Sequence, residues 1–148
     1  MKSIRSALFV ILLLPISSML MASMDTTGFA QMTAKENAEL EQIMIETAKK
    51  LNAQTPMMVD KETRLDAVIC SGLVLHYKCT LVNLSQAEDD IDLKVLKSEM
   101  KKQFLNNQCK DENIVKTLRV GVEYYYNYFD KDGYLLATGV VNRKNCGF

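Results

Sequence analysis

The chain lacks an excess of charge of either sign. Its 148 residues carry 18 Lys and Arg against 18 Asp and Glu. Nucleic-acid binding needs a clustered basic excess, so this balance argues against a nucleic-acid partner. The chain also lacks internal repeats, low-complexity tracts and any linker long enough to separate two domains. These absences predict a single domain that does not bind nucleic acid.

The sequence is also poor in the residues that build catalytic and metal sites. His76 is its single histidine, and it has no Gly-x-Ser-x-Gly and no Cys-x-x-Cys motif. A Ser, Cys or Thr nucleophile needs a base, and a redox thiol needs an activating neighbour. The spacing of Cys70, His76 and Cys79 is not one that zinc sites use. We therefore predict no enzymatic activity, no metal and no cofactor; a small envelope hydrolase or a thiol redox enzyme stays as an alternative.

The N-terminus has the features of a secretory signal peptide. Lys2 and Arg5 give a short positive start, and residues 7–20 form an apolar run that Pro15 interrupts. The run is too short and too interrupted for a comfortable membrane span, but it suits the apolar region of a signal peptide. We expect export, with no stable membrane span after the signal is removed. An uncleaved N-terminal anchor is the alternative.

Two cleavage sites fit the rule of small residues before the cut. Cleavage after Ala30, with Gly28 at the third position back, is one, and cleavage after Ala22 is its rival. No cysteine follows either site, so a lipid-modified N-terminus is not expected. We take residues 1–30 as the signal peptide and residues 31–148 as one domain, located in the periplasm or secreted.

Apolar periodicity and turn residues predict the order helix, two strands, helix, two strands. Thr33 and Glu36 form a capping box at the start of the first helix. The expected elements are a helix over 34–52, a hairpin over 65–84, a helix over 93–107 with one or two further turns over 111–118, and a hairpin over 120–141. The predicted fold class is α+β, with a four-stranded antiparallel sheet of two hairpins packed against two helices.

The register of the first hairpin follows from its expected turn, Ser71-Gly72. With these two residues as the loop, Cys70 faces Leu73. Because strand side chains alternate, one face then carries a mainly apolar set. That set is Leu73, Leu75, Tyr77, Cys79 and Leu81.

All four cysteines lie in the exported part of the chain, where an even number suggests disulfides. The expected register separates Cys70 from Cys79 by roughly 20 Å along the hairpin, too far for a bond. We therefore favour a bond between Cys109 and Cys146. Cys70 and Cys79 would then be buried thiols, unless the register differs.

Tyrosines dominate the first strand of the second hairpin. Tyr124, Tyr126 and Tyr128 share one face, while Tyr125 and Phe129 share the other. One face must pack on the helices, so the other exposes aromatic side chains of the kind that protein interfaces favour. We take Tyr124, Tyr126 and Tyr128 as candidate partner-binding residues. The alternative is that these tyrosines only stabilise the sheet as cross-strand pairs.

Two functions fit these features. The first is a non-catalytic exported module that binds an envelope or secreted protein through its sheet face or an edge strand, as an inhibitor, immunity factor or envelope accessory would. The second is a carrier of a small apolar ligand, with a pocket between helices and sheet. The residues expected to line that pocket are Met44, Leu75, Tyr77, Met100 and Phe104.

Several short motifs occur together in the predicted domain. They are Leu51-Asn-x3-Pro56-Met-Met-Val-Asp60-x2-Thr63-Arg-Leu-Asp66, Tyr77-x2-Thr80-Leu-Val-Asn83, Asn106-Asn107-x-Cys109, Tyr134 in a glycine-turn hairpin, and a terminal Cys146-Gly-Phe. On these motifs, residues 51–148 resemble a widespread family of small exported bacterial proteins of unassigned function. The resemblance supports the Cys109–Cys146 bond and implies a bacterial source. In layout alone, the chain resembles cystatin-like folds.

Overall fold

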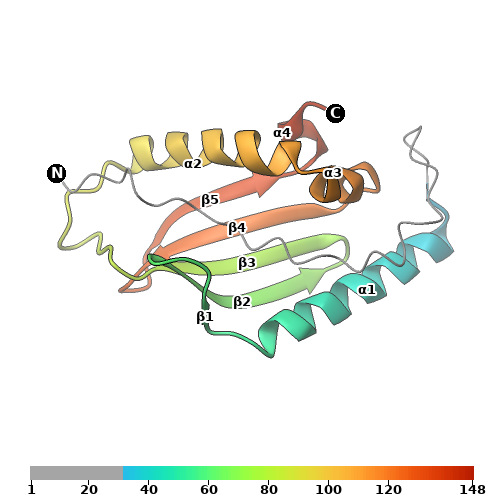
Figure 1. Cartoon of the computed structure of the whole chain (residues 1–148), viewed down its shortest axis with the longest axis horizontal. Coiled ribbons are helices and arrows are strands. Elements are labelled where there is room, and N and C mark those ends of the chain that lie inside the picture. The colour runs from blue at the N-terminus through green and yellow to red at the C-terminus, as the bar shows by residue number, and fades with distance from the viewer. Residues whose placement is uncertain (1–31) are drawn as a thin grey trace.

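The computed structural model describes residues 32–148 (Figure 1). The predicted signal peptide and both candidate cleavage sites lie outside these residues. The elements are helix α1 (Ala34–Asn52), strands β1 (Met57–Met58), β2 (Thr63–Ser71) and β3 (Val74–Leu81), helix α2 (Leu93–Asn107), the 3-10 turn η3 (Gln108–Lys110), helix α3 (Glu112–Arg119), strands β4 (Glu123–Asp130) and β5 (Leu135–Val141), and the short helix α4 (Arg143–Cys146).

The fold is α+β, as predicted, but its sheet has five strands and is mixed. The strand order is β1-β2-β3-β4-β5, and β3 pairs with β4 in parallel. The expectation of a four-stranded antiparallel sheet is therefore wrong. The chain leaves β3 and crosses the sheet through α2, η3 and α3 before it enters β4. A helical crossover returns the chain to the end where the previous strand began, which makes the two strands parallel.

The fifth strand, β1, comes from the short extended run after Pro56. Its two residues pair with β2, Met57 opposite Leu65 and Met58 opposite Arg64. A two-residue strand is too short to show a period-2 pattern, which is why the sequence did not reveal it.

The first hairpin turns one residue later than predicted, at Gly72-Leu73 in place of Ser71-Gly72, which shifts the cross-strand partners of residues 67–71 of β2 by two positions. Ser71 pairs with Val74, and Cys70 pairs with Leu75. Gly72 has a φ of 58°, the positive value that a two-residue hairpin loop favours at its first position. Because the pairing shifts by two residues, the face assignment is unchanged, and Leu75, Cys79 and Leu81 are buried as the alternation indicated.

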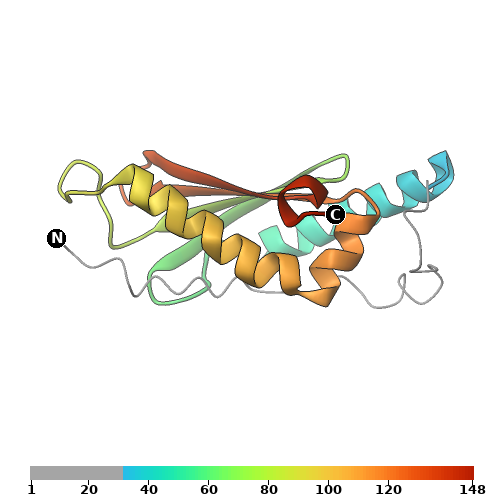
Figure 2. The ribbon, with the colours of Figure 1, turned by 90° about the horizontal axis from the view of Figure 1, so that it is seen from above.

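The helices cover one face of the sheet. α1 packs along β2 at one side, and α2 packs along β5 at the other. Figure 2 shows α2 and α3 on one side of the sheet. The core between them is built from alternate residues of each strand and from the apolar stripes of the helices. The helical stripes are Leu40, Met44, Ala48 and Leu51 in α1, and Leu96, Met100 and Phe104 in α2.

A disulfide links Cys109 in η3 to Cys146 in α4, with an S–S distance of 2.04 Å. It ties the end of the crossover to the C-terminal segment. Cys70 and Cys79 are free thiols; Cys79 is buried as expected, whereas Cys70 is only half-buried. Cys79 lies opposite Leu65 in the hairpin, four positions from Leu75, the residue that pairs with Cys70. Among residues 32–148, no helix is long and apolar enough to cross a membrane.

Candidate functional site

The three tyrosines expected to bind a partner lie in the core. Tyr124 and Tyr128 are each 1% exposed and Tyr126 is 3% exposed. Tyr126 stacks on Phe104 of α2, with ring centroids 5.1 Å apart, and the Tyr124 hydroxyl hydrogen-bonds Thr117 in α3. The sequence did not say which face of β4 the helices cover, and they cover this one. Tyr124, Tyr126 and Tyr128 therefore hold the helices to the sheet and do not form a contact surface.

The opposite, outer face of the sheet carries a mixed set of side chains. The register places Ile69, His76, Tyr125 and Val140 in one row across four strands. The His76 and Tyr125 rings lie 5.1 Å apart, and Ile69 is exposed. This face presents small apolar and aromatic patches between polar groups.

Neither His76 nor the free thiols has the surroundings of a catalytic group. His76 lies on the outer face of the sheet against Tyr125, whereas Cys79 is buried on the inner face. Burial, with the nearby charges of Asp66 and Asp60, raises the pKa of Cys79 to about 12, and burial followed by the charge of Glu41 raises the pKa of Cys70. Both cysteines are neutral thiols at neutral pH, the poorly nucleophilic form.

The described residues bring no three His, Cys, Asp or Glu side chains together in a way that would hold a metal ion.

A groove with a volume of about 550 Å³ runs between α2 and β5. The helix contributes the apolar side chains of Met100, Phe104 and Leu105 to its lining, together with two exposed lysines, Lys97 and Lys101. Along the sheet it follows six consecutive residues of β5, from Leu135 to Val140, and Cys109 and Asn145 complete the lining. The volume is within the range of small-molecule sites, but the groove follows the length of a strand.

β5 is an edge strand, so half of its backbone groups point away from the sheet. The Val140 carbonyl is one of them, because it accepts a hydrogen bond from the Asn145 side-chain amide at 3.0 Å. Alternate residues of a strand direct their N–H and C=O to the same side, so those of Thr138 also point to the open edge. Among residues 32–148, no strand pairs with this edge.

At the opposite edge of the sheet, outward backbone groups of β2 have partners. β1 pairs with the first part of β2, and beyond it the Asn52 side chain bonds to both backbone groups of Val68. Asn52 Oδ1 accepts from the Val68 N–H at 2.7 Å, and its Nδ2 donates to the Val68 carbonyl. The side chain thus takes the place of a neighbouring strand at this position, and the β2 edge is blocked there.

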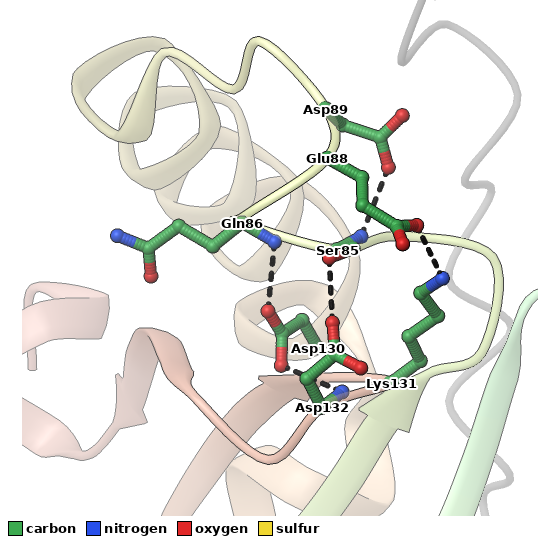
Figure 3. A network of polar contacts seen from close by, with 7 residues as sticks. All are labelled: Ser85, Gln86, Glu88, Asp89, Asp130, Lys131 and Asp132. Carbon is green, nitrogen blue, oxygen red and sulfur yellow. Dashed lines mark hydrogen bonds and ion pairs between the residues drawn. The ribbon is translucent and has the colours of Figure 1, made fainter.

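The position of α2 over β5 depends on a polar network between the loop before α2 and the β4–β5 turn (Figure 3). The Ser85 hydroxyl donates to Asp132, the Gln86 N–H donates to Asp130 at 2.8 Å, and Lys131 pairs with Glu88. These bonds hold the start of the helical crossover against the turn that begins β5. The two walls of the groove are therefore fastened together at one end.

Asp130 is the centre of this network, and its side chain is almost fully covered. Burial acts to raise the pKa of its carboxyl, but backbone N–H groups of Gln86, Tyr134, Asp132 and Gly133 outweigh that effect and hold the pKa below the ordinary value. The carboxylate is therefore charged at neutral pH, and it organises the turn as an acceptor. At the other end of the groove, the Cys109–Cys146 disulfide fastens the end of the crossover to the segment after β5.

The pocket predicted from sequence differs from this groove. Of its five expected residues, Met100 and Phe104 line the groove, whereas Met44 and Leu75 are at most 1% exposed in the core. Tyr77 is half-buried and stacks on Tyr126, with centroids 4.9 Å apart.

Sequence reasoning missed β5 as part of a site. Gly139 was the available signal, because a glycine inside a strand often marks the close approach of another group. Here a Cβ on Gly139 would lie 1.9 Å from the Phe104 ring, so the glycine lets that ring lie against the strand.

No protein-family model and no curated protein matches the chain. Solved structures with similar folds do exist. One is EpsS, the pilotin of the type 2 secretion system of Vibrio vulnificus, with a TM-score of 0.61 and 15% identity over 77% of this chain and 97% of that chain. Another is AspS, the type II secretion system pilotin of Vibrio cholerae, with a TM-score of 0.56 and 18% identity over 76% and 97%.

A third similar structure is a candidate secreted protein of Pseudomonas aeruginosa, with a TM-score of 0.59 and 16% identity over 78% of this chain and 98% of that one. At these identities, the likenesses establish a shared fold. They agree with the resemblance to small exported bacterial proteins, and they do not confirm the cystatin-like layout.

Proposed function

We propose that the chain is a non-catalytic accessory protein of the bacterial cell envelope that binds a segment of a partner protein in the groove between α2 and β5. The observation that carries the proposal is the apolar groove that follows an open edge strand for six residues. A partner segment there gains apolar burial from Met100, Phe104 and Leu105, and it meets backbone groups that have no strand beside them.

Two further features support this assignment. Two of the proteins with the same fold are pilotins of a type II secretion system, which makes an envelope-accessory role the natural comparison. The predicted signal peptide would take the chain to that compartment. In addition, the neutral thiols and the isolated His76 supply no activated nucleophile in the part of the chain that the structure describes.

Site-specific photo-cross-linking in cells tests the proposal. A photoreactive amino acid replaces Leu135 or Leu105 in the groove, and the matched controls carry it at Ile69 on the outer sheet face or Val95 on α2. Leu135, Ile69 and Val95 are each more than half exposed, so these substitutions perturb the fold little. Leu105 is half-buried, and its variant is compared for stability first.

We expect a defined cross-linked partner from the two groove positions and none from the controls. The substitution Leu135→Asp should abolish the Leu105 cross-link by placing a charge in the groove, while Ile69→Asp should leave it unchanged. Cross-links from Ile69 in place of the groove positions would contradict the proposal and move the contact surface to the outer face of the sheet.

A further inference from the structure

We infer that the groove takes its partner as an extended strand, which adds to β5 as a sixth strand and carries acidic side chains toward Lys97 and Lys101. The inference rests on the proposed function and specifies the mode and the chemistry of binding. The occupant is thus an extended segment of a partner protein, apolar at one end and acidic at the other.

The backbone of β5 is available for this pairing. The Glu123 N–H of β4 points toward β3, since it donates to the Leu73 carbonyl. Backbone groups alternate in direction along a strand, so those of Tyr124, Tyr126 and Tyr128 point toward β5. Their partners in β5, which form the ladder bonds, are Val141, Gly139 and Ala137. The N–H and C=O of Thr138 therefore point outward, together with the N–H of Val140. A strand placed beside β5 would satisfy them, and addition to an exposed sheet edge is an established mode of peptide recognition.

The two ends of the groove differ in chemical character, one cationic and the other apolar. Figure 1 shows α2 lying beside β5 and running in the same direction, and the Phe104 ring lies against Gly139. Lys97 precedes Phe104 by seven positions, about 10 Å along a helix, which corresponds to about three strand residues. Lys97 is therefore level with Leu136, and Lys101 with Thr138. The cationic end of the groove is at the start of β5, and the apolar end, at Phe104 and Leu105, is near Val140.

The two lysines favour acidic side chains on the added strand. Neither has an ion-pair partner among residues 32–148, and the pair sits at i and i+4 on one face of α2. Residues four apart on a helix are about 6 Å apart, and residues two apart on a strand are about 6.7 Å apart. Two carboxylates two positions apart on the same side of an extended strand can therefore reach both lysines.

Binding of blocked nine-residue peptides to the purified oxidised protein tests the inference. The first peptide has two glutamates two positions apart, followed by alternating valines, with threonine elsewhere. The second has lysine at the two glutamate positions. Both are also made in the reversed order, because the added strand can run in either direction. The readouts are the dissociation constant and the hydrogen exchange of the Thr138 amide by NMR.

We expect one order of the glutamate peptide to bind about tenfold or more tightly than its lysine counterpart at low salt, with a smaller ratio at high salt. The bound peptide should slow exchange of the Thr138 amide. The double variant Lys97→Glu/Lys101→Glu should reverse the preference. Lys94→Glu/Lys110→Glu, which makes the same charge change at exposed lysines outside the groove, should keep it.

The variant Thr138→Pro removes the outward N–H without removing a β4–β5 ladder bond, and it should weaken binding about tenfold or more. Its matched control, Thr138→Val, keeps the N–H and should bind as the parent does. If Thr138→Pro does not fold, the exchange measurement on the parent protein decides.

Unchanged exchange at Thr138 in the bound state, or equal affinity for the glutamate and lysine peptides, would overturn the strand inference. If the groove still yields its partner cross-link in that case, the proposed function stands and only the binding mode is wrong. If the groove positions cross-link to no partner protein, the proposed function itself fails. A cross-link from Leu135 to a second copy of this chain, with no peptide binding, would make the edge a dimer contact and overturn both.

Discussion

Replacement of Gly139 by alanine should strain the contact that forms the apolar end of the groove. A Cβ at this position would lie 1.9 Å from Phe104 Cε2, 2.5 Å from Cζ and 2.6 Å from Cδ2. Carbon atoms in contact normally stay about 3.5–4.0 Å apart, so the ring must move by about 1.5 Å or more. The ring has little room, because it stacks on Tyr126 and is 6% exposed. We expect Gly139→Ala to cost about 1–3 kcal/mol of unfolding free energy.

A double-mutant cycle identifies the cause. Phe104→Leu alone should cost about 1–2 kcal/mol because it removes part of a buried ring. In the Phe104→Leu background, however, Gly139→Ala should cost much less, since a smaller side chain leaves space for the new methyl group. The coupling between the two positions should be at least about 1 kcal/mol. Urea unfolding of the four proteins measures it, with an unchanged m-value as the condition for comparison.

Thr138→Ala is the control for the cycle, because Thr138 is exposed on the outer face and does not touch Phe104 through its side chain. Its cost should be the same with Phe or Leu at position 104. An alanine at position 139 that costs less than about 0.5 kcal/mol, or costs that add to within that amount, would refute the reasoning that this glycine exists to receive the ring.

Three other predictions concern parts of the structure outside the groove floor. Asn52→Ala should lower the unfolding free energy by about 1–2 kcal/mol, because it removes two hydrogen bonds to the β2 backbone. Asn52→Asp keeps the bond accepted from the Val68 N–H but sets a carboxylate oxygen against the Val68 carbonyl oxygen, so it should cost at least as much; urea unfolding measures both. The pair Cys109→Ser/Cys146→Ser should cost about 4 kcal/mol in the chain-entropy model for a separation of 37 residues, measured against the oxidised parent and a reduced sample. Cys79 holds its proton in the folded state up to a pKa of about 12, whereas the unfolded thiol ionises near pH 9. The stabilisation that this thiol gives the folded state is complete below pH 9 and is lost as the pH rises toward 12, by about 1.4 kcal/mol per pH unit. Cys79→Ala should therefore make the free energy of unfolding fall less steeply with pH in this range. An unchanged slope of unfolding free energy against pH would contradict the burial of this thiol.

Local signals in the sequence predicted the helices well. The capping box of Thr33 and Glu36 forms, with the Thr33 N–H donating to Glu36 at 2.7 Å, and the first helix spans the predicted residues. The Asp92 side chain accepts from two N–H groups at the start of α2. These features depend on residues within one turn of each other, so nothing distant in the chain was needed to predict them.

Features that depend on distant contacts were not predictable in this way. The parallel pairing of β3 with β4 results from how the whole crossover packs, which no single segment encodes. Distant contacts also decide which face of β4 is buried. Both faces carry aromatic residues, and the face with Tyr126 is buried because Phe104, more than 20 positions earlier in the chain, stacks on it.

No sequence pattern could indicate the groove. It needs α2 to lie over β5, and that placement depends on the Asp130 network at one end and on the Cys109–Cys146 bond at the other. The sequence supported the disulfide and predicted a hairpin over residues 120–141. It did not show that the turn of this hairpin would be held to the loop before α2, since Ser85 and Asp132 are 47 positions apart.

The two edges of the sheet are treated in opposite ways, and this contrast bears on function. An exposed edge strand is an aggregation hazard, so proteins usually cover it, shorten it or place charges or bulges along it. This chain uses a two-residue strand and the Asn52 side chain to close the β2 edge. At β5 it caps one carbonyl with Asn145 and leaves the neighbouring groups beside an apolar groove. Because the β2 edge is covered, the open β5 edge points to a function for that edge. A strand that recruits a partner must keep its backbone groups free, and lysines lining the groove would discourage the like-charged edge of a second copy while admitting an acidic segment.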